Sequence, residues 1–133
     1  MSRRERTLLL DDRPLIFLPA VARAVGSTNR ALILQQIHYW LGVVQGGVDW
    51  GGHHWTWQSI SALCDQLGNT VDERTLRREI SAMENLRVLV SMPRGAIDPR
   101  CDPRDRTKAY RIDESVLRQL SDVAEATREA PLA

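Results

Sequence analysis

Apolar residues recur at the spacing of an α-helix through most of this chain, with shorter apolar runs between the helical stretches. Residues that favour helix starts (Ser and Asp) and helix ends (Gly) divide the pattern into segments. The sequence predicts a series of helices in which the second is long. They are expected at 20–24, 28–44, 60–67, 73–87 and from 113 or 114 to about 124.

Two strands are predicted after the 73–87 helix, at 88–92 and 108–112, on either side of a loop rich in Pro, Arg and Asp. Trp55 and Trp57 share a face if the segment around them is a strand, because successive strand side chains alternate. The glycine pairs at 46–47 and 51–52 indicate a flexible loop before that segment.

The order of these elements predicts the fold. Two helices joined by a tight turn and followed by a hairpin describe a winged helix-turn-helix. We therefore expect an α+β, mostly helical fold, a winged helix-turn-helix with a two-stranded wing hairpin. Residues 1–13 are expected to form a polar N-terminal arm, 14–124 the winged-helix domain and 125–133 a flexible C-terminal tail.

The 28–44 helix carries the stretch LQQIHYW and is apolar on two sides. At about 100° per residue, its two stripes are Ile33, Ile37, Trp40, Leu41 and Val44, and Leu32, Tyr39 and Val43. A helix apolar on two sides is usually buried in a core or an oligomer interface. We expect Trp40 in the core, Tyr39 packed with its hydroxyl hydrogen-bonded, and His38 near the surface. We also expect a homodimer that uses this helix or the terminal segments.

The 73–87 helix separates apolar residues from basic ones. Leu76, Ile80 and Met83 share the face that is expected to pack. The opposite face carries no acid, because Glu79 and Glu84 fall toward its flanks. Its members are Arg74, Arg77, Arg78, Ser81 and Asn85. Arginine forks can bind guanine in the DNA major groove, and Ser and Asn can contact bases or phosphates, so this helix is the candidate recognition helix.

Further phosphate contacts are expected on either side of this helix. Thr75 and the free backbone amides of its first turn suit a phosphate oxygen. The loop at about 93–107 is the candidate wing. Its best-placed bases are Arg94, Arg106 and Lys108, ahead of Arg100 and Arg104. Three aspartates dilute the charge of this loop, and a solvated surface loop is the alternative interpretation.

Composition narrows the class of protein. Apolar residues make up 43% of the 133 residues and charged residues 26%, which is typical of a soluble domain, and the net charge is only +1. No apolar run approaches the ~18 residues of a membrane span, and the N-terminus does not read as a signal peptide. Cys64 and Cys101 fit a reducing compartment and form no CxxC pair. A cytoplasmic protein without a membrane partner is expected.

Motifs of catalysis are missing from the sequence. The histidines and cysteines lack metal-ligand spacing, and no HExxH, phosphate-cradling P-loop or GxSxG motif is present. His53 and His54, beside glycines, are the weak remaining candidate for a metal. We expect no enzyme activity, no metal and no cofactor.

Several short motifs resemble the N-terminal winged-helix domain of phage and plasmid replication proteins, the replisome-organiser and DnaD-like helicase-loader group. They are PLIFLPAVARAVG, ALILQQIHYWL, HHWTWQS, RTLRREISAMENLRVLV and DRTKAYRID, in family order over roughly 14–113. The resemblance implies DNA binding at a replication origin or in a mobile element, with Thr75 and Arg78 at the recognition-helix Thr and Arg. The family's usual Gly before the first wing strand is Arg87 here, which is expected to change the local turn. Members usually carry a further C-terminal domain, and only about 20 residues follow the last predicted strand here, so helicase loading is not expected.

Two functions remain open at this stage. The first is a non-enzymatic double-stranded DNA-binding protein that acts in replication initiation or in regulation of a phage- or plasmid-type mobile element, with replication proteins as further candidate partners. The second is a protein-interaction winged helix, an adaptor or an inhibitor of a host machine that does not bind DNA. The near-neutral charge favours the second function, and the basic helix face favours the first.

Overall fold

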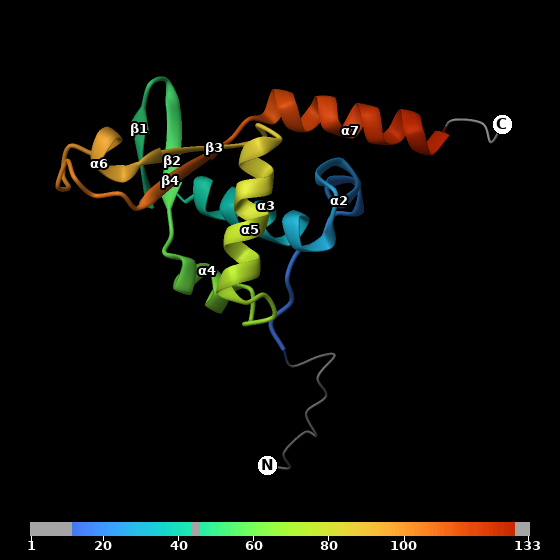
Figure 1. The fold of residues 1–133 in the computed structure, drawn as a ribbon, viewed down its shortest axis with the longest axis horizontal. Coiled ribbons are helices and arrows are strands. Elements are labelled where there is room, and N and C mark those ends of the chain that lie inside the picture. The colour runs from blue at the N-terminus through green and yellow to red at the C-terminus, as the bar shows by residue number, and fades with distance from the viewer. Residues whose placement is uncertain (1–11, 44–45, 130–133) are drawn as a thin grey trace, which may run out of the picture.

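The computed structural model describes residues 12–43 and 46–129 and shows an α+β protein (Figure 1). The predicted class is therefore confirmed at the level of helices with an antiparallel sheet. In chain order the elements are α2 (Pro19–Val25), α3 (Thr28–Leu41), β1 (Gly47–Trp50), β2 (His53–Trp57), α4 (Ile60–Gln66), α5 (Glu73–Asn85), β3 (Leu89–Pro93), α6 (Arg94–Ile97), β4 (Lys108–Ile112) and α7 (Glu114–Glu129). None of the described helices is long and apolar enough to cross a membrane.

The sheet has the strand order β1-β2-β4-β3, with every neighbouring pair antiparallel. The antiparallel pair β3–β4 expected from the sequence is present, with Ser91 opposite Tyr110, but it belongs to a four-stranded sheet rather than to a separate two-stranded wing, because β4 also pairs with β2. Because strand side chains alternate, the sheet buries one set of residues on each face. Tyr110 and Leu89 enter the main core, whereas Ala109 enters a second cluster on the other face.

The main core lies between this sheet and the helices. It contains the apolar residues predicted to pack from α5, which are Leu76, Ile80 and Met83, each at most 2% exposed. The buried residues of α3 that join them are Ile33, Leu34 and Ile37. Helix α7 adds partly buried side chains at its first turns and then crosses α2 (Figure 1).

The second cluster is built on tryptophan. Trp55 is buried and Trp57 packs beside it on the same face of β2, as the alternation predicts. Ile97 of α6 covers them from the loop between β3 and β4. This loop is therefore attached to the sheet by its own small core.

Side-chain caps from Ser or Asp begin four of the described helices, and at α7 the Asp113 carboxylate accepts from the Val116 amide at 3.1 Å. Ser27 accepts a hydrogen bond from the Arg30 amide at the start of α3. Ser59 does the same at α4, and Asp72 does so at α5. Each cap satisfies an amide that the first helical turn leaves unpaired, so helix starts were the most predictable boundaries.

Helix α3 differs from the prediction at Trp40, in the first apolar stripe, and at Tyr39, in the second. The first stripe packs as expected at Ile33 and Ile37, whereas Trp40 is only half-buried and outside the core cluster. Its indole Nε1 donates to Gln66 Oε1 at 2.8 Å. Tyr39 is 59% exposed, so the expectation of a packed tyrosine is wrong, while the exposed His38 agrees with the prediction. Strands and α5 cover only one side of α3, and the other side faces an open groove. Val44, assigned to the first stripe, lies outside the described residues.

Other elements and helix ends also differ from the sequence prediction, and α3 ends at Leu41 rather than at 44. The glycine-rich segment expected as a flexible loop forms β1 and a turn at Gly51 and Gly52, because positive φ angles at both residues let the chain reverse into β2. The loop after β3 contains the short helix α6. Helix α7 continues to Glu129 rather than fading at Ala124, because an ion pair between Arg23 and Glu125, at 2.9 Å, joins it to α2.

The turn between α5 and β3 contains the one arginine with a left-handed backbone among the described residues. Arg87 has a φ angle of 65°, the region that glycine favours. The expected change of turn is therefore not seen, since the chain keeps a glycine-type conformation and places an arginine in it. An L-residue in this region costs about 1–2 kcal/mol.

We expect Arg87→Gly to raise the free energy of unfolding by about 1 kcal/mol, because glycine relieves the steric strain of the left-handed conformation. Urea denaturation followed by tryptophan fluorescence measures this change. Arg87→Ala is the matched control, since alanine removes the same side chain but keeps the Cβ and so should bring no comparable gain. Equal stability of the two variants would contradict the assignment of strain to this backbone.

Candidate nucleic-acid interface

The outer face of α5 is exposed and basic. Five of the predicted residues are exposed along it, namely Arg74, Arg77, Arg78, Ser81 and Asn85. They lie opposite the buried Leu76, Ile80 and Met83, so packing of the apolar face fixes the direction in which the polar face points. The predicted grouping of these five residues on one exposed face is confirmed.

The two acidic flanks of α5 are occupied by partners on different elements. On one flank, Glu79 Oε2 lies 2.6 Å from Arg30 Nε of α3. On the other flank, Glu84 Oε1 lies 2.9 Å from Lys108 Nζ of β4, and the Ser91 hydroxyl also donates to this carboxylate. These two acids therefore attach α5 to the rest of the fold, although Glu79 Oε1 also lies 3.6 Å from Nε of Arg78 on the basic face.

The first turn of α5 is less available to a ligand than the sequence indicates. The Thr75 amide already donates to Asp72 Oδ1 at 2.7 Å, and Thr75 is half-buried. This donation lowers the pKa of Asp72, which therefore stays ionised at the helix start. Of the first-turn amides expected to suit a phosphate oxygen, that of Thr75 is therefore already used by the N-cap.

The aspartates of the loop from α6 to β4 offset its positive charge, and they also fix its conformation through hydrogen bonds. Asp98 and Asp102 each begin an Asp-Pro-Arg tripeptide, and in each the carboxylate accepts from the amide and the guanidinium of the arginine two residues later. The Asp105 carboxylate accepts from the Thr107 amide at 2.9 Å in the same way. These are local side-chain turns that fix the loop backbone.

Asp98 is the buried member of this series. Its residue is 1% exposed, and its carboxylate accepts from Arg94 Nε and from the amide and Nε of Arg100. The amide of Arg100 is the main reason that the pKa of Asp98 is lowered. A buried charge needs such partners, so Asp98 holds two arginines of the loop in place.

The bases predicted in this loop therefore differ in availability. The Arg94 guanidinium lies 4.1 Å from the centre of the Trp57 ring and pairs with Asp98, which gives Arg94 a structural role. Arg100 and Arg104 each pair with an aspartate. Arg106 is exposed and forms no ion pair with any residue that the structure describes.

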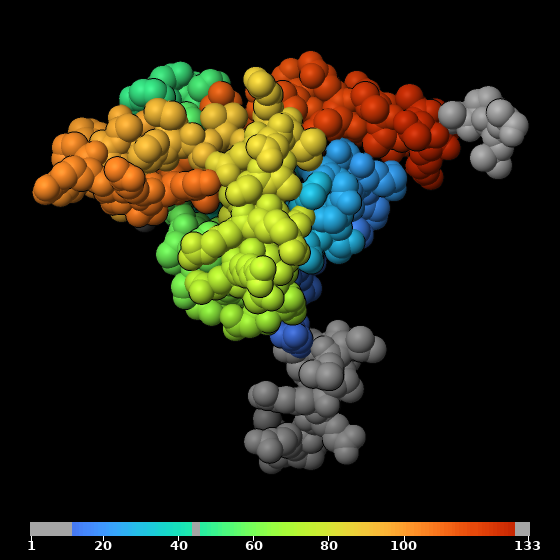
Figure 2. Space-filling view, in the orientation of Figure 1, coloured from blue at the N-terminus to red at the C-terminus, as the bar shows by residue number. Residues whose placement is uncertain are grey.

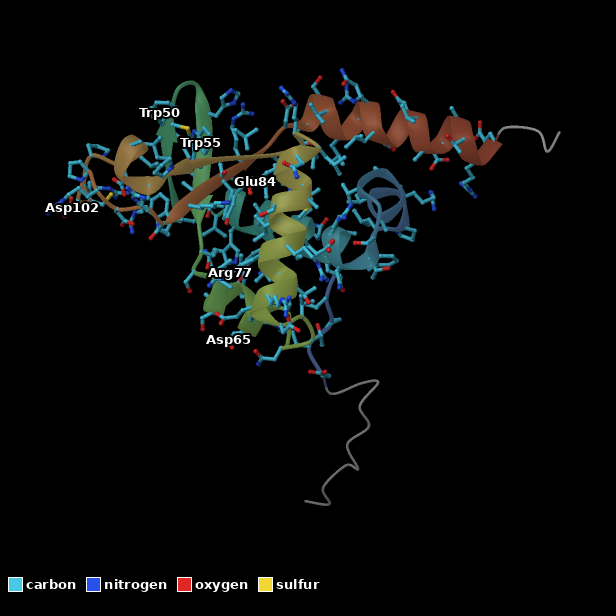
Figure 3. The ribbon with its side chains drawn as sticks, viewed as in Figure 1. Trp50, Trp55, Asp65, Arg77, Glu84 and Asp102 are labelled. Atoms are coloured by element: carbon cyan, nitrogen blue, oxygen red, sulfur yellow. The ribbon has the colours of Figure 1, made fainter. Side chains whose placement is uncertain are left out.

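A hollow lies where α4, α5 and β4 meet, and we call it the α5–β4 notch. Its volume is about 490 Å³. Its polar lining comprises Gln58, Ser59, Arg77, Ser81, Arg106, Thr107, Lys108 and Tyr110. The structure thus brings together four of the predicted site residues from two separate elements. Arg77 and Glu84 lie along the side of α5 that faces the hairpin (Figure 3), and these elements surround the hollow on the face seen in Figure 2.

Tyr110, Gln58 and Ser59 are the notch residues that the sequence analysis missed. Tyr110 is two residues from Lys108 on β4, and residues two apart on a strand share a face, so the signal was present. Burial, and to a smaller extent the nearby Glu84 carboxylate, raise the pKa of Tyr110 to about 12. Its hydroxyl therefore remains protonated, a hydrogen-bond donor, at neutral pH.

The histidines that were the weak metal candidate do not form a ligand cluster. His54 Nδ1 lies 2.7 Å from Asp49 Oδ1, opposite it on β1, while His53 is exposed. Within 12–43 and 46–129, no three His, Cys, Asp or Glu side chains come together as a metal site.

Comparison of the chain with protein-family models, with curated proteins and with solved structures found no match. The similarity to replication proteins therefore depends on short motifs alone.

We expect Asp98→Asn to destabilise the protein at neutral pH, because a neutral amide cannot balance the two arginines. The folded-state pKa of Asp98 lies below its ordinary value of 3.8, so its contribution is present above pH 3.8 and is lost as the pH falls through the lower folded-state value. The difference from the parent should be full at neutral pH and should shrink once the pH is brought below 3.8. Urea titrations at the two pH values measure it.

Asp102→Asn is the matched control for this prediction. Asp102 begins the same tripeptide, but its side chain is 54% exposed, whereas that of Asp98 is 0% exposed. The control should change stability much less, since solvent screens an exposed pair. If both variants lose the same stability, burial of Asp98 is not what holds the loop.

Proposed function

We propose that this protein is a non-enzymatic, double-stranded DNA-binding winged-helix protein of the cytoplasm. Its role is in replication initiation or in regulation of a phage- or plasmid-type mobile element. The single observation that supports the proposal best is the exposed basic face of α5, which continues into the α5–β4 notch and Arg106.

In the proposed complex, α5 is the recognition helix and enters the major groove. It has 13 residues, hence about 20 Å of length at 1.5 Å per residue, and the groove of B-DNA admits a helix of this kind. Arg74 forms no ion pair among the described residues, and the Arg78 side chain is 69% exposed although its Nε lies 3.6 Å from Glu79 Oε1. In the proposed complex both form two-pronged hydrogen bonds to guanine, while Asn85 and Ser81 reach bases or phosphates.

The β3–β4 hairpin is the proposed wing, and it contacts the DNA backbone. Arg106 is its main phosphate contact, because the other loop arginines have aspartate partners. Lys108 contributes less, since its ammonium group is already paired with Glu84 at 2.9 Å. Arg94 supports the loop from beneath and does not touch DNA.

A second candidate function is an adaptor or inhibitor winged helix that binds protein, including replication proteins, and no DNA. The observation that favours it is that aspartates within the loop neutralise most of the loop arginines. Three of the loop arginines are paired with Asp98 or Asp102, and the whole chain carries a net charge of only +1. A DNA-binding surface built on few unpaired bases should show a modest dependence on salt.

The DNA-binding proposal predicts different effects for helix and wing substitutions. Arg78→Ala should reduce the preference for a selected site over a scrambled one by about 1–3 kcal/mol, because it removes a base contact. Arg106→Ala should weaken all sequences alike and lower the salt slope by about one unit. The measurement is fluorescence anisotropy on both duplexes across a salt series, with the site taken from a genomic-fragment selection.

Arg118→Ala is the charge-matched control for both variants. Arg118 is exposed on α7, away from the notch, and it forms no ion pair with the residues that the structure describes. It should bind like the parent. If the parent binds no duplex at low salt, or if all three variants bind equally, the DNA-binding proposal fails and protein partners that survive nuclease treatment become the next search.

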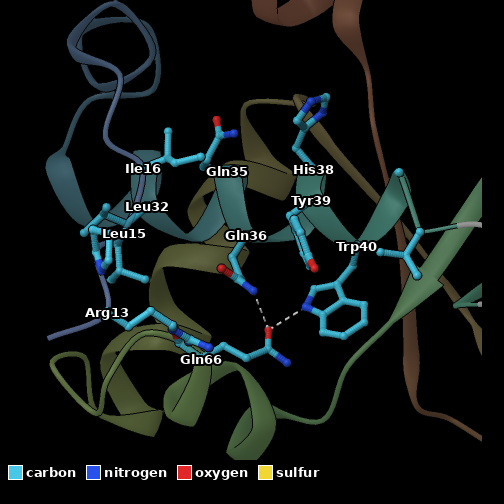
Figure 4. Close-up of a pocket in the computed structure, with 13 residues that line it drawn as sticks. Arg13, Leu15, Ile16, Leu32, Gln35, Gln36, His38, Tyr39, Trp40 and Gln66 are labelled. Carbon is cyan, nitrogen blue, oxygen red and sulfur yellow. Dashed lines mark hydrogen bonds between the residues drawn. The ribbon is translucent and has the colours of Figure 1, made fainter. Parts of the chain in front are cut away.

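We also propose that the protein forms a homodimer through the open side of α3. A groove of about 810 Å³ separates α3 from the segment before α2, and its apolar lining includes Leu15, Ile16, Leu32 and Tyr39 (Figure 4). Ile16 is 62% exposed and Tyr39 is 59% exposed. Exposed apolar patches of this kind mark interaction surfaces. A second copy is the proposed occupant, because Phe17 and Leu18 continue the exposed patch beside Ile16.

Sedimentation velocity over a micromolar concentration series tests the dimer. The parent should shift from monomer to dimer as concentration rises. Ile16→Asp should remain a monomer, because a carboxylate cannot be buried unpaired at the interface. Val123→Asp places the same charge on an exposed apolar residue of α7 and should still dimerise. A parent that stays monomeric at high micromolar concentration would rule out this interface.

A further inference from the structure

Tyr110 makes the α5–β4 notch more than a surface depression. Its residue is 2% exposed, yet it lines the notch, and its hydroxyl forms no hydrogen bond with any residue in the described part of the chain. The hydroxyl is not among the buried side-chain atoms that lack a partner in the described residues, which are His54 Nε2 and Arg111 Nε, so it reaches the open space of the notch. A ligand atom in the notch would supply the missing partner.

The charges around this hydroxyl indicate the chemistry of that ligand. Arg77 lines the notch from α5 and Arg106 lines it from the loop just before β4, and neither forms an ion pair among the residues described. Two guanidinium groups and a neutral O–H donor are suited to an oxyanion, which accepts every hydrogen bond they offer. Ser81 adds a further hydroxyl from the next turn of α5.

The carboxylate of Glu84 already behaves as an anion at the edge of this site. It accepts from Lys108 Nζ at 2.9 and 3.0 Å and from the Ser91 hydroxyl. Glu84 is therefore already paired with Lys108, one of the cations near the notch, when no ligand is bound. It also opposes the entry of a second anion by direct repulsion.

We propose that the notch is a phosphate site that holds one phosphodiester of bound DNA, with Arg77, Arg106 and the Tyr110 hydroxyl as donors and Glu84 as an internal competitor for Lys108. This inference rests on the proposed function and adds a contact residue that no basic-face argument contains. The phosphate chemistry is shared by a DNA backbone and by free inorganic phosphate, and the experiment separates these two sources.

The first test removes one atom. Tyr110→Phe deletes the hydroxyl and keeps the ring that packs in the core, so a thermal melt should match the parent. We expect duplex binding to weaken about tenfold, the usual effect of losing a hydrogen bond to a charged acceptor. The salt slope should not change, because no charge is lost. Arg77→Ala weakens binding too, and there the slope should fall by about one unit.

The second test releases the competitor. Glu84→Gln should tighten duplex binding about fivefold at low salt and raise the salt slope by about one unit, because Lys108 becomes free. Lys108→Ala should then have a larger effect in the Glu84→Gln background than in the parent. Asp122→Asn on α7 changes the net charge equally and is the matched control, with little effect expected.

The outcomes separate this inference from the proposed function. If Arg78→Ala weakens duplex binding while Tyr110→Phe and Glu84→Gln behave as the parent, DNA binding stands and the phosphate site is overturned. If neither the parent nor any variant binds duplex, thermal melts with added inorganic phosphate are the next measurement. Phosphate that raises the melting temperature of the parent but not that of Tyr110→Phe supports a site for free phosphate. Absence of that stabilisation overturns the site together with DNA binding.

Discussion

Burial of one face of α5 is the constraint on which the rest of the structure depends. Leu76, Ile80 and Met83 are almost fully removed from water, and burial of such side chains stabilises a fold by about 1.5–3 kcal/mol each. Rotation of the helix would expose all three at once. The exposed arginines are therefore held in a fixed direction, and the acids at the flanks, Glu79 and Glu84, add contacts to α3 and β4.

In the loop between β3 and β4, the many charged side chains pair with one another. The loop is attached to the sheet through Ile97 and the Trp57–Arg94 contact, and the buried Asp98 carboxylate holds two arginines. Pairing of this kind gives the loop a defined shape at the expense of free positive charge. The loop arginines are thus mostly structural, and the bases left for a ligand are those at the junction with α5.

The same molecule carries two surfaces of opposite character. The α5–β4 notch is polar and basic, whereas the groove beside α3 is lined by apolar residues and glutamines, with Gln66 at the centre of its hydrogen bonds to Gln36 and Trp40 (Figure 4). A phosphate backbone and a second copy of the chain would use different elements. In the proposed function, dimerisation and DNA binding therefore do not compete, and two recognition helices can act on two half-sites.

The sequence by itself determined the helix starts, the packing face of α5 and the pairing of Trp55 with Trp57 on one face, because each depends on local capping chemistry or on a simple period. It also placed the basic residues of α5 on one exposed face. Only the tertiary structure decided which charges are available, since Arg94, Lys108 and the Thr75 amide acquire partners from other segments or from the cap. The same is true of Tyr39 and Trp40, whose burial depends on whether another element covers their side of α3. The sequence did not predict the left-handed backbone of Arg87, because this conformation follows from the way α5 leads into β3 rather than from the preference of arginine.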